Sequence, residues 1–198
     1  MPAVTVSAGL LAAGESRRMG KANKLLLDLD GAPVVRRTAE RILAAGIAEL
    51  VAVLGHQGEA VAAALNGLPL RSVVNPDYAA GQMTSVRAGL SALEAPGDAV
   101  MICLADQPLL TAADYRLLIE AFAGRGDKSI LVPVHRGARG NPVMLAASHL
   151  GDIAGRRANL GCRQLIDRNP DLVETVEVSS DRFERDIDTE ADYRAVVG

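Results

Sequence analysis

The sequence predicts an α/β fold in which helices cover both faces of a mostly parallel sheet. Short apolar runs rich in β-branched residues alternate along the chain with segments of helical periodicity. Aromatic residues are scarce, with two Phe, three Tyr and no Trp, which is typical of a sheet buried between Ala- and Leu-rich helices. The length of 198 residues lies at the upper end of one ordinary domain, so we expect one domain over residues 1–198.

The apolar runs predict six strands, at Val4–Leu11, Leu50–Leu54, Leu70–Val74, Ala99–Leu104, Ser129–Val134 and Val173–Val178. The helical patterns predict six helices, at Val34–Ala45, Gly58–Asn66, Thr84–Leu93, Thr111–Ala123, Ala158–Arg168 and Glu190–Val197. Pro33 and Gly46 mark the two ends of the first helix, and Thr111 with Asp114 forms a capping pattern. This order implies parallel strands joined by right-handed crossovers.

One segment, His135–Val143, breaks the alternation of strands and helices. It is rich in turn residues and positive charge, so we expect a loop or hairpin inserted beside the functional site.

Composition and charge exclude several classes of protein. The net charge is −3 and no Lys/Arg block is present, so nothing indicates a nucleic-acid partner. Cys103 and Cys162 are far apart and lack Cys-x-x-Cys spacing, which argues against disulfides or zinc and favours reduced cytoplasmic thiols. No apolar run approaches the ~18 residues that span a bilayer, and no basic residue precedes the first apolar run. We expect a soluble cytoplasmic protein without a membrane partner.

Polar and small residues follow several of the predicted strands directly. These positions are Ala12–Gly14, His56, Asn75 and Asp106. Because ligands of open parallel sheets sit beyond the carboxyl ends of the strands, we expect these residues to converge on one site. His56, His135 and His149 lack metal-ligand spacing and are interpreted as ordinary polar residues, with His56 alone favoured as a site residue because it ends a strand on the ligand side.

The first loop, Ala12–Lys24, combines small residues with four cations. Its backbone N–H groups and cations suit a polyphosphate, although a solvated basic loop is the alternative. It is not a Walker A loop, because five residues separate Gly14 from Gly20 and Ala22 stands where a hydroxyl is required. The Gly-x-Gly-x-x-Gly dinucleotide pattern is also absent.

Three carboxylates are candidate metal ligands. Asp106 follows a buried strand, where a carboxylate is costly to desolvate without a partner such as a divalent cation; a turn or helix cap is the alternative. Asp186 and Asp188 precede the last helix, and Asp188 or Thr189 could instead cap that helix. We favour Asp186 as the second ligand.

A series of motifs then occurs in a fixed order over almost the whole chain. They are Leu11-Ala12-Ala13-Gly14 with Arg18-Met19-Gly20 and Lys24, Gly31-x-Pro33, Asn75 to Gly81 with Ser85–Leu90, Asp106-Gln107-Pro108, Arg139-Gly140-Asn141-Pro142, and Asp186–Thr189. In this order and spacing the sequence resembles the molybdenum cofactor nucleotidyltransferases, a MobA-like NTP transferase family within the Rossmann-like nucleotide-sugar pyrophosphorylases.

The resemblance implies a role for each matching residue. The catalytic residues would be Lys24 at the α-phosphate, Arg18 at the outer phosphates and Asp106, which would hold Mg²⁺ together with Asp186 or Asp188. The nucleotide would also contact Leu11, Ala12, Ala13, Gly14, His56, Asn75, Gly81 and Ser85. Arg139 and Asn141 would lie on the acceptor side.

The substrates are also implied by the resemblance. Ala13 before Gly14 favours CTP over GTP as the donor, with molybdopterin or its metal complex as the acceptor. A molybdoenzyme or its chaperone would receive the product. Transfer to a sugar phosphate, a non-catalytic nucleotide-binding protein and a nicotinamide-dependent oxidoreductase on the same fold remain the alternatives.

Overall fold

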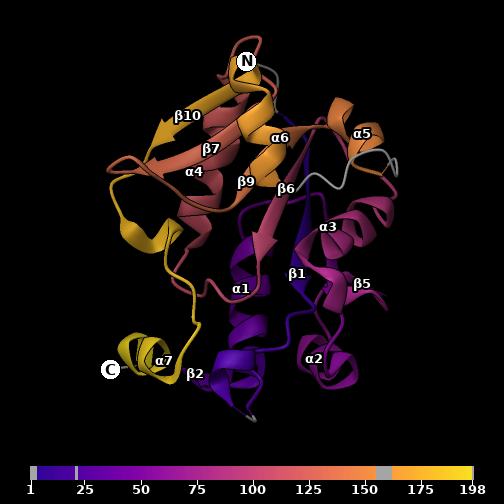
Figure 1. Ribbon diagram of the computed structural model, residues 1–198, viewed down its shortest axis with the longest axis vertical. Coiled ribbons are helices and arrows are strands. Elements are labelled where there is room, and N and C mark those ends of the chain that lie inside the picture. The colour runs from indigo at the N-terminus through magenta and orange to yellow at the C-terminus, as the bar shows by residue number, and fades with distance from the viewer. Residues whose placement is uncertain (1–3, 21, 155–161, 198) are drawn as a thin grey trace.

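A computed structural model of the chain describes residues 4–20, 22–154 and 162–197 (Figure 1). In this described part the main sheet has eight strands, in the order β10-β7-β9-β6-β1-β4-β5, with β8 paired to β7. The strands are β1 (Val6–Ala12), β4 (Glu49–Leu54), β5 (Arg71–Val74), β6 (Ala99–Leu104), β7 (Ile130–His135), β8 (Ala138–Arg139), β9 (Val143–Ala146) and β10 (Val173–Glu177). Two short strands, β2 (Asp28–Leu29) and β3 (Ala32–Pro33), form a separate hairpin.

The helices of the described chain are α1 (Val34–Leu43), α2 (Gly58–Leu65), α3 (Gln82–Ser91), α4 (Ala112–Ala123), α5 (Leu150–Ala154), α6 (Cys162–Arg168) and α7 (Glu190–Val197). Five of the six predicted helices are confirmed, including the capping box of Thr111 and Asp114 at the start of α4, and the described part of the sixth is the helix α6. The first residues of the predicted helix Ala158–Arg168 lie outside the described residues, as does Lys21 of the first loop. Helix α5 was not predicted.

The α/β fold with a mostly parallel sheet is confirmed. All six predicted strands are present, and β1 pairs in parallel with both β4 and β6, as β4 does with β5 and β7 with β10. Strand β9 was missed, and it runs antiparallel between β6 and β7. Its run Val143–Ala146 is too short for periodicity to separate strand from helix. The segment expected as a loop or hairpin forms the turn from β7 into β8 and then leads into β9.

The order of the strands creates a switch point beside β1. From β1 the chain moves outward through α1 to β4 and through α2 to β5, and α3 then returns it to β6 on the other side of β1. In open parallel sheets the ligand crevice lies at the carboxyl ends of the two strands that flank such a point. The fold therefore places the site at the ends of β1 and β6.

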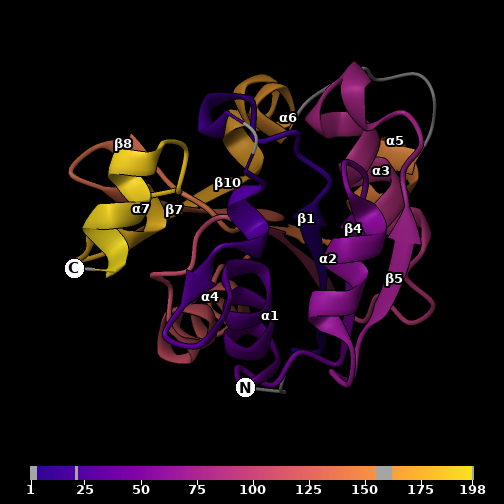
Figure 2. The ribbon, with the colours of Figure 1, turned by 90° about the horizontal axis from the view of Figure 1, so that it is seen from below.

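Helices lie on both faces of the sheet (Figure 2), and alternating side chains of the strands pack against them. In β6, Met101 and Cys103 pack in the cluster that includes residues of α1, α2 and α4. Val100 and Ile102 pack in the cluster of α3, α5 and α6. Among the described helices none is long and apolar enough to cross a bilayer.

Two packing contacts bring α3 and the segment before α7 to the carboxyl ends of the strands. Gly89 lets α3 lie close to the sheet, because a Cβ there would be 2.8 Å from Val53 Cγ2, and the N-terminus of α3 thereby faces the edge. At the other end of the chain, Ile187 is buried with Leu29 and Val34. This packing holds the segment before α7 across the same edge.

Candidate active site

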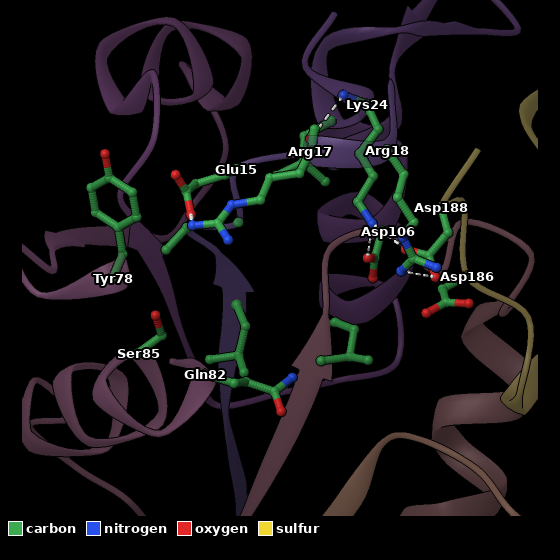
Figure 3. Close-up of a pocket in the computed structure, with 16 residues that line it drawn as sticks. Glu15, Arg17, Arg18, Lys24, Tyr78, Gln82, Ser85, Asp106, Asp186 and Asp188 are labelled. Atoms are coloured by element: carbon green, nitrogen blue, oxygen red, sulfur yellow. Dashed lines mark hydrogen bonds and ion pairs between the residues drawn. The ribbon is translucent and has the colours of Figure 1, made fainter. Parts of the chain in front are cut away.

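A cavity of about 440 Å³ opens at the carboxyl ends of β1 and β6. It is lined by Leu11, Ala13, Gly14, Glu15, Ser16, Arg17, Arg18, Lys24, Leu25, Tyr78, Gln82, Ser85, Leu104, Asp106, Asp186 and Asp188. Figure 3 shows that Lys24 and Arg18 extend toward the three Asp side chains, while Tyr78 and Ser85 stand on the opposite side. We call the part around Lys24, Arg18 and the three Asp residues the ionic end, and the part around Ala13, Gly55 and Tyr78 the neutral end. The Glu15–Arg17 ion pair lies on the same side of the cavity as Tyr78 (Figure 3).

The first loop folds back on itself through two polar side chains. Ser16 adopts a left-handed conformation with φ 51°, and its Oγ accepts a hydrogen bond from the backbone N–H of Lys24 at 3.2 Å. The Oδ1 of buried Asn23 accepts from the N–H of Leu25 at 3.0 Å. These bonds fix the backbone around Lys24, so that its side chain enters the cavity.

The ionic end joins residues from three distant parts of the chain. Lys24 Nζ lies 2.6 Å from Asp106 Oδ2 and 2.9 Å from Asp188 Oδ1. Arg18 pairs with the other oxygen of Asp188 at 2.5 Å. The N–H of Ile187 donates to the carbonyl oxygen of Asp106 at 2.9 Å, and this bond holds Asp186 and Asp188 beside Asp106.

The surroundings shift the pKa of two of these groups in informative directions. Burial raises the pKa of the Asp186 carboxyl, and Asp106 and Asp188 raise it further. Burial lowers the pKa of Lys24, but attraction by Asp106 and Asp188 outweighs this effect and the pKa of Lys24 is raised. Lys24 is therefore a firmly charged ammonium, whereas the charge of Asp186 is poorly compensated.

The three carboxylates fit a hard divalent cation. One oxygen each of Asp106, Asp186 and Asp188 lies within 4.8 Å of the others, and carboxylate oxygens are the ligands that Mg²⁺ and Mn²⁺ prefer. The start of α7 does not need Asp186 or Asp188, because Thr189 caps it: Thr189 Oγ1 accepts from the N–H of Asp192 at 3.2 Å. Of the two predicted candidates for the helix cap, Thr189 and not Asp188 caps α7.

Nine of the predicted site residues line the cavity, and the others lie outside its lining. Leu11, Ala13, Gly14, Arg18, Lys24, Ser85, Asp106, Asp186 and Asp188 line it. Ala12 instead points into the core. His56 does not line the cavity. Its backbone N–H donates to the carbonyl oxygen of Ala13 at 3.3 Å, and its ring lies edge-on to Tyr78 with the ring centroids 6.4 Å apart.

Asn75 and Gly81 shape the wall of the cavity rather than line it. Buried Asn75 donates from Nδ2 to Thr84 Oγ1 at 2.8 Å and to Ser85 Oγ at 3.0 Å. Gly81 precedes α3 with φ 116°, a conformation that favours glycine. Both residues hold the turn that carries Tyr78 and the start of α3.

The predicted acceptor residues lie on the β7–β8 side of the sheet. Arg139 pairs with Asp167 at 2.5 Å, and both side chains are about half exposed. The N–H of Asn141 donates to the carbonyl oxygen of Phe183 at 2.8 Å. Neither residue lines the cavity at β1 and β6.

Sequence reasoning missed Glu15 and Tyr78, which line the cavity. Tyr78 lies in a turn three residues after Asn75. The only signal in the sequence for Tyr78 was its position shortly after the end of β5. Gly55 makes room for it: a Cβ there would lie 2.8 Å from Tyr78 Cγ and 2.7 Å from Ala13 Cβ.

A second cavity of about 300 Å³ adjoins the first and shares Arg18, Asp186 and Asp188 with it. Its other lining residues include Pro108, Leu109 and Arg185. Asp186 and Asp188 therefore border both cavities.

Comparisons with known proteins agree with this geometry. The family described as MobA-like NTP transferase domain matches residues 8–173. Nicotine blue oxidoreductase of Paenarthrobacter nicotinovorans is 33% identical over 189 residues, which cover 93% of this chain and 92% of that protein. A probable molybdenum cofactor guanylyltransferase of Natronomonas pharaonis is 39% identical over 101 residues, covering 51% of this chain and 49% of that protein.

Among solved structures, a nucleotidyl transferase from Methanothermobacter superposes with a TM-score of 0.83 at 26% identity. That match covers 98% of this chain and 96% of the other. The fold is therefore shared with a nucleotidyl transferase over nearly the entire chain.

Proposed function

This chain belongs to the family of MobA-like NTP transferase domains, and we propose that it transfers CMP from CTP to a molybdopterin-type acceptor with release of pyrophosphate. The observation that carries the proposal is the ionic end of the cavity. There Lys24 and Arg18 stand beside Asp106, Asp186 and Asp188, at the strand ends where the fold binds ligands.

The chemistry of the cavity suits a nucleoside triphosphate with its cation. The two cations can neutralise phosphate oxygens, and the N-terminus of α3, with Gln82 and Ser85 on the cavity wall, adds a positive dipole end. Asp106 with Asp186 or Asp188 would hold Mg²⁺, which would neutralise phosphate charge and act as a Lewis acid.

In the proposed reaction a terminal phosphate oxygen of the acceptor attacks the α-phosphorus of CTP in line. A new P–O bond forms, and the bond from the α-phosphorus to the oxygen bridging the α- and β-phosphates breaks, so that pyrophosphate leaves. Lys24 would stabilise the charge that grows on the α-phosphoryl oxygens, and Arg18 the charge on the leaving group. A phosphate acceptor is already ionised at neutral pH, so the reaction needs no protein base.

CTP is the proposed donor because of the loop that ends β1. Ala13 precedes Gly14, and in the family such an ending goes with cytidylyl transfer. The Ala13 methyl packs toward Gly55 at the neutral end, where a base would lie if the phosphates occupy the ionic end. The relative from Natronomonas is named as a guanylyltransferase, which makes GTP the competing donor.

The test is pyrophosphate release with each of the four nucleoside triphosphates, with and without molybdenum cofactor and with Mg²⁺ or EDTA. We expect release only with CTP, cofactor and Mg²⁺ together. A sugar phosphate that replaces the cofactor at equal efficiency would contradict the proposed acceptor.

A second candidate function is oxidoreduction, because the relative that matches 93% of this chain is named nicotine blue oxidoreductase. The cavity could then hold a nicotinamide cofactor, although the dinucleotide pattern is absent from the first loop. Oxidation of NADH or NADPH with nicotine blue, in the absence of CTP and Mg²⁺, would favour this function over nucleotidyl transfer.

A further inference from the structure

The ammonium of Lys24 contacts two of the three carboxylates that could hold a divalent metal ion. Its Nζ is 2.6 Å from Asp106 Oδ2 and 2.9 Å from Asp188 Oδ1, so it bridges two of the three carboxylates that could hold a divalent ion. Figure 3 shows the lysine side chain directed into this group. The space between the two carboxylates is therefore occupied by a cation of the protein itself.

The ammonium competes with a metal ion for Asp106 Oδ2 and Asp188 Oδ1, the two oxygens that it contacts. Mg²⁺ binds oxygen at about 2.0–2.1 Å and demands near-octahedral geometry, so its ligand sphere would overlap an Nζ that already contacts both carboxylates. Two cations so close would also repel each other strongly in a partly buried site. A metal ion that binds these two oxygens of Asp106 and Asp188 thus requires that the lysine side chain move.

The backbone around Lys24 is fixed, but its side chain can move. Its N–H is bonded to Ser16 Oγ, and the neighbouring Leu25 is buried in the core. A lysine carries its charge on a flexible four-carbon stem. A phosphate group in the cavity offers the ammonium a second anionic partner, and a shift of the side chain alone would exchange one for the other.

We propose that Lys24 is an internal cation that blocks the carboxylate site until the phosphates of a nucleotide draw it away. Free divalent metal then binds the protein weakly, and metal and nucleotide bind cooperatively. By thermodynamic linkage, each tightens the binding of the other by the same factor. This inference rests on the proposed function, because it needs a triphosphate in the cavity.

The proposal predicts an unusual effect of removing a residue from the active site. Lys24→Met should increase the affinity of the protein alone for Mn²⁺, used as the probe ion, by about tenfold or more. Lys24→Arg keeps a cation at the carboxylates and should leave Mn²⁺ binding weak. If Lys24 only neutralised the carboxylates to stabilise the fold, Lys24→Met would lower stability without creating a metal site.

The experiment measures Mn²⁺ binding to the full chain by titration calorimetry, and CTP binding by equilibrium dialysis with and without Mn²⁺. Lys128→Met is the matched control, because Lys128 lies before β7 at the opposite edge of the sheet and donates to the carbonyl oxygen of Asp171. It removes the same charge without touching the carboxylates. Thermal unfolding of each variant confirms that it is folded.

The outcomes separate this inference from the proposed function. Tight Mn²⁺ binding by Lys24→Met, with weak binding by the wild type, Lys24→Arg and Lys128→Met, supports it. Mn²⁺ binding by Lys24→Met no tighter than by the wild type overturns it, even if the wild type binds CTP and releases pyrophosphate. A wild type that retains no CTP, with or without Mn²⁺, overturns both.

Discussion

The two ends of the cavity are built in different ways. At the ionic end, Lys24 and Asp188 are separated by 164 residues along the chain and meet through ion pairs. At the neutral end, Ala13 and Tyr78 meet around Gly55, with contacts that depend on shape rather than charge. The ionic end should therefore respond to charge, metal and pH, whereas the neutral end should respond to the volume of its side chains.

The two ends should also differ in their role, with the ionic end acting in phosphoryl transfer and the neutral end in the choice of base. Charged groups can stabilise charge that develops on phosphates during transfer. A wall of small and aromatic side chains can instead discriminate between bases by fit. Variants of the ionic end should mainly lower kcat, and variants of the neutral end should mainly raise KM for the nucleotide.

The largest effect is expected from Asp106→Asn, which keeps the shape of the side chain and removes its charge. Loss of about 3 kcal/mol of transition-state stabilisation would lower kcat by ~100-fold or more. Steady-state pyrophosphate release measures this effect, with Asp127→Asn at an exposed turn as the matched control. A kcat of Asp106→Asn close to that of the wild type would contradict a role of the ionic end in the chemical step.

The next effect is expected from Gly55→Ala, which tests the packing of the neutral end. The new Cβ would lie 2.7 Å from Ala13 Cβ and 2.8 Å from Ala13 O and Tyr78 Cγ, so the free energy of unfolding should fall by about 2 kcal/mol. Urea unfolding measures it. Gly151→Ala in α5 is the control, because its Cβ would meet nothing within 4 Å. Equal stability of the two variants would show that the neutral end is loosely packed.

Tyr78→Ala tests whether the neutral end holds the base. Loss of stacking should raise KM for CTP about tenfold with little change in kcat, while Tyr78→Phe should behave like the wild type. Initial rates over a range of CTP concentrations separate KM from kcat. A fall in kcat without a change in KM would assign Tyr78 to the chemistry instead, and the contrast between the two ends would be lost.

The smallest effect concerns pH and the stability of the ionic end. Burial and then Asp106 and Asp188 raise the pKa of Asp186, so the folded protein binds a proton there more readily than the unfolded chain does. Stability should thus fall as pH rises through the range between the ordinary and the raised pKa. At neutral pH Asp186→Asn should be slightly more stable than the wild type.

Thermal unfolding in EDTA, at pH 4 and pH 7, measures this difference. The advantage of Asp186→Asn should be present at pH 7 and smaller at pH 4, where the wild-type carboxyl takes up a proton. If Asp186→Asn were stabilised more at pH 4 than at pH 7, the result would contradict a raised pKa of Asp186 in the folded protein.

The sequence by itself determined the alternation of strands and helices, and with it the edge of the sheet where the site lies. Periodicity is a local property of the sequence. Crossovers between parallel strands bring the carboxyl ends of these strands to the same side of the sheet, whatever the length of the connections. The position of Asp106 directly after β6 follows from this rule, whereas Lys24 lies well beyond the end of β1 and reaches the cavity through a loop held by Ser16 and Asn23. Strand β9 did not follow, because a four-residue apolar run has no distinctive period.

The tertiary structure alone decided which residues touch. Ile187 is buried against Leu29 and Val34, and this distant packing holds Asp188 close enough to pair with Lys24. Likewise, the close approach at Gly55 brings Tyr78 to the cavity. Such contacts depend on how side chains from separate elements fill a shared space, and no local pattern in a sequence records that fit.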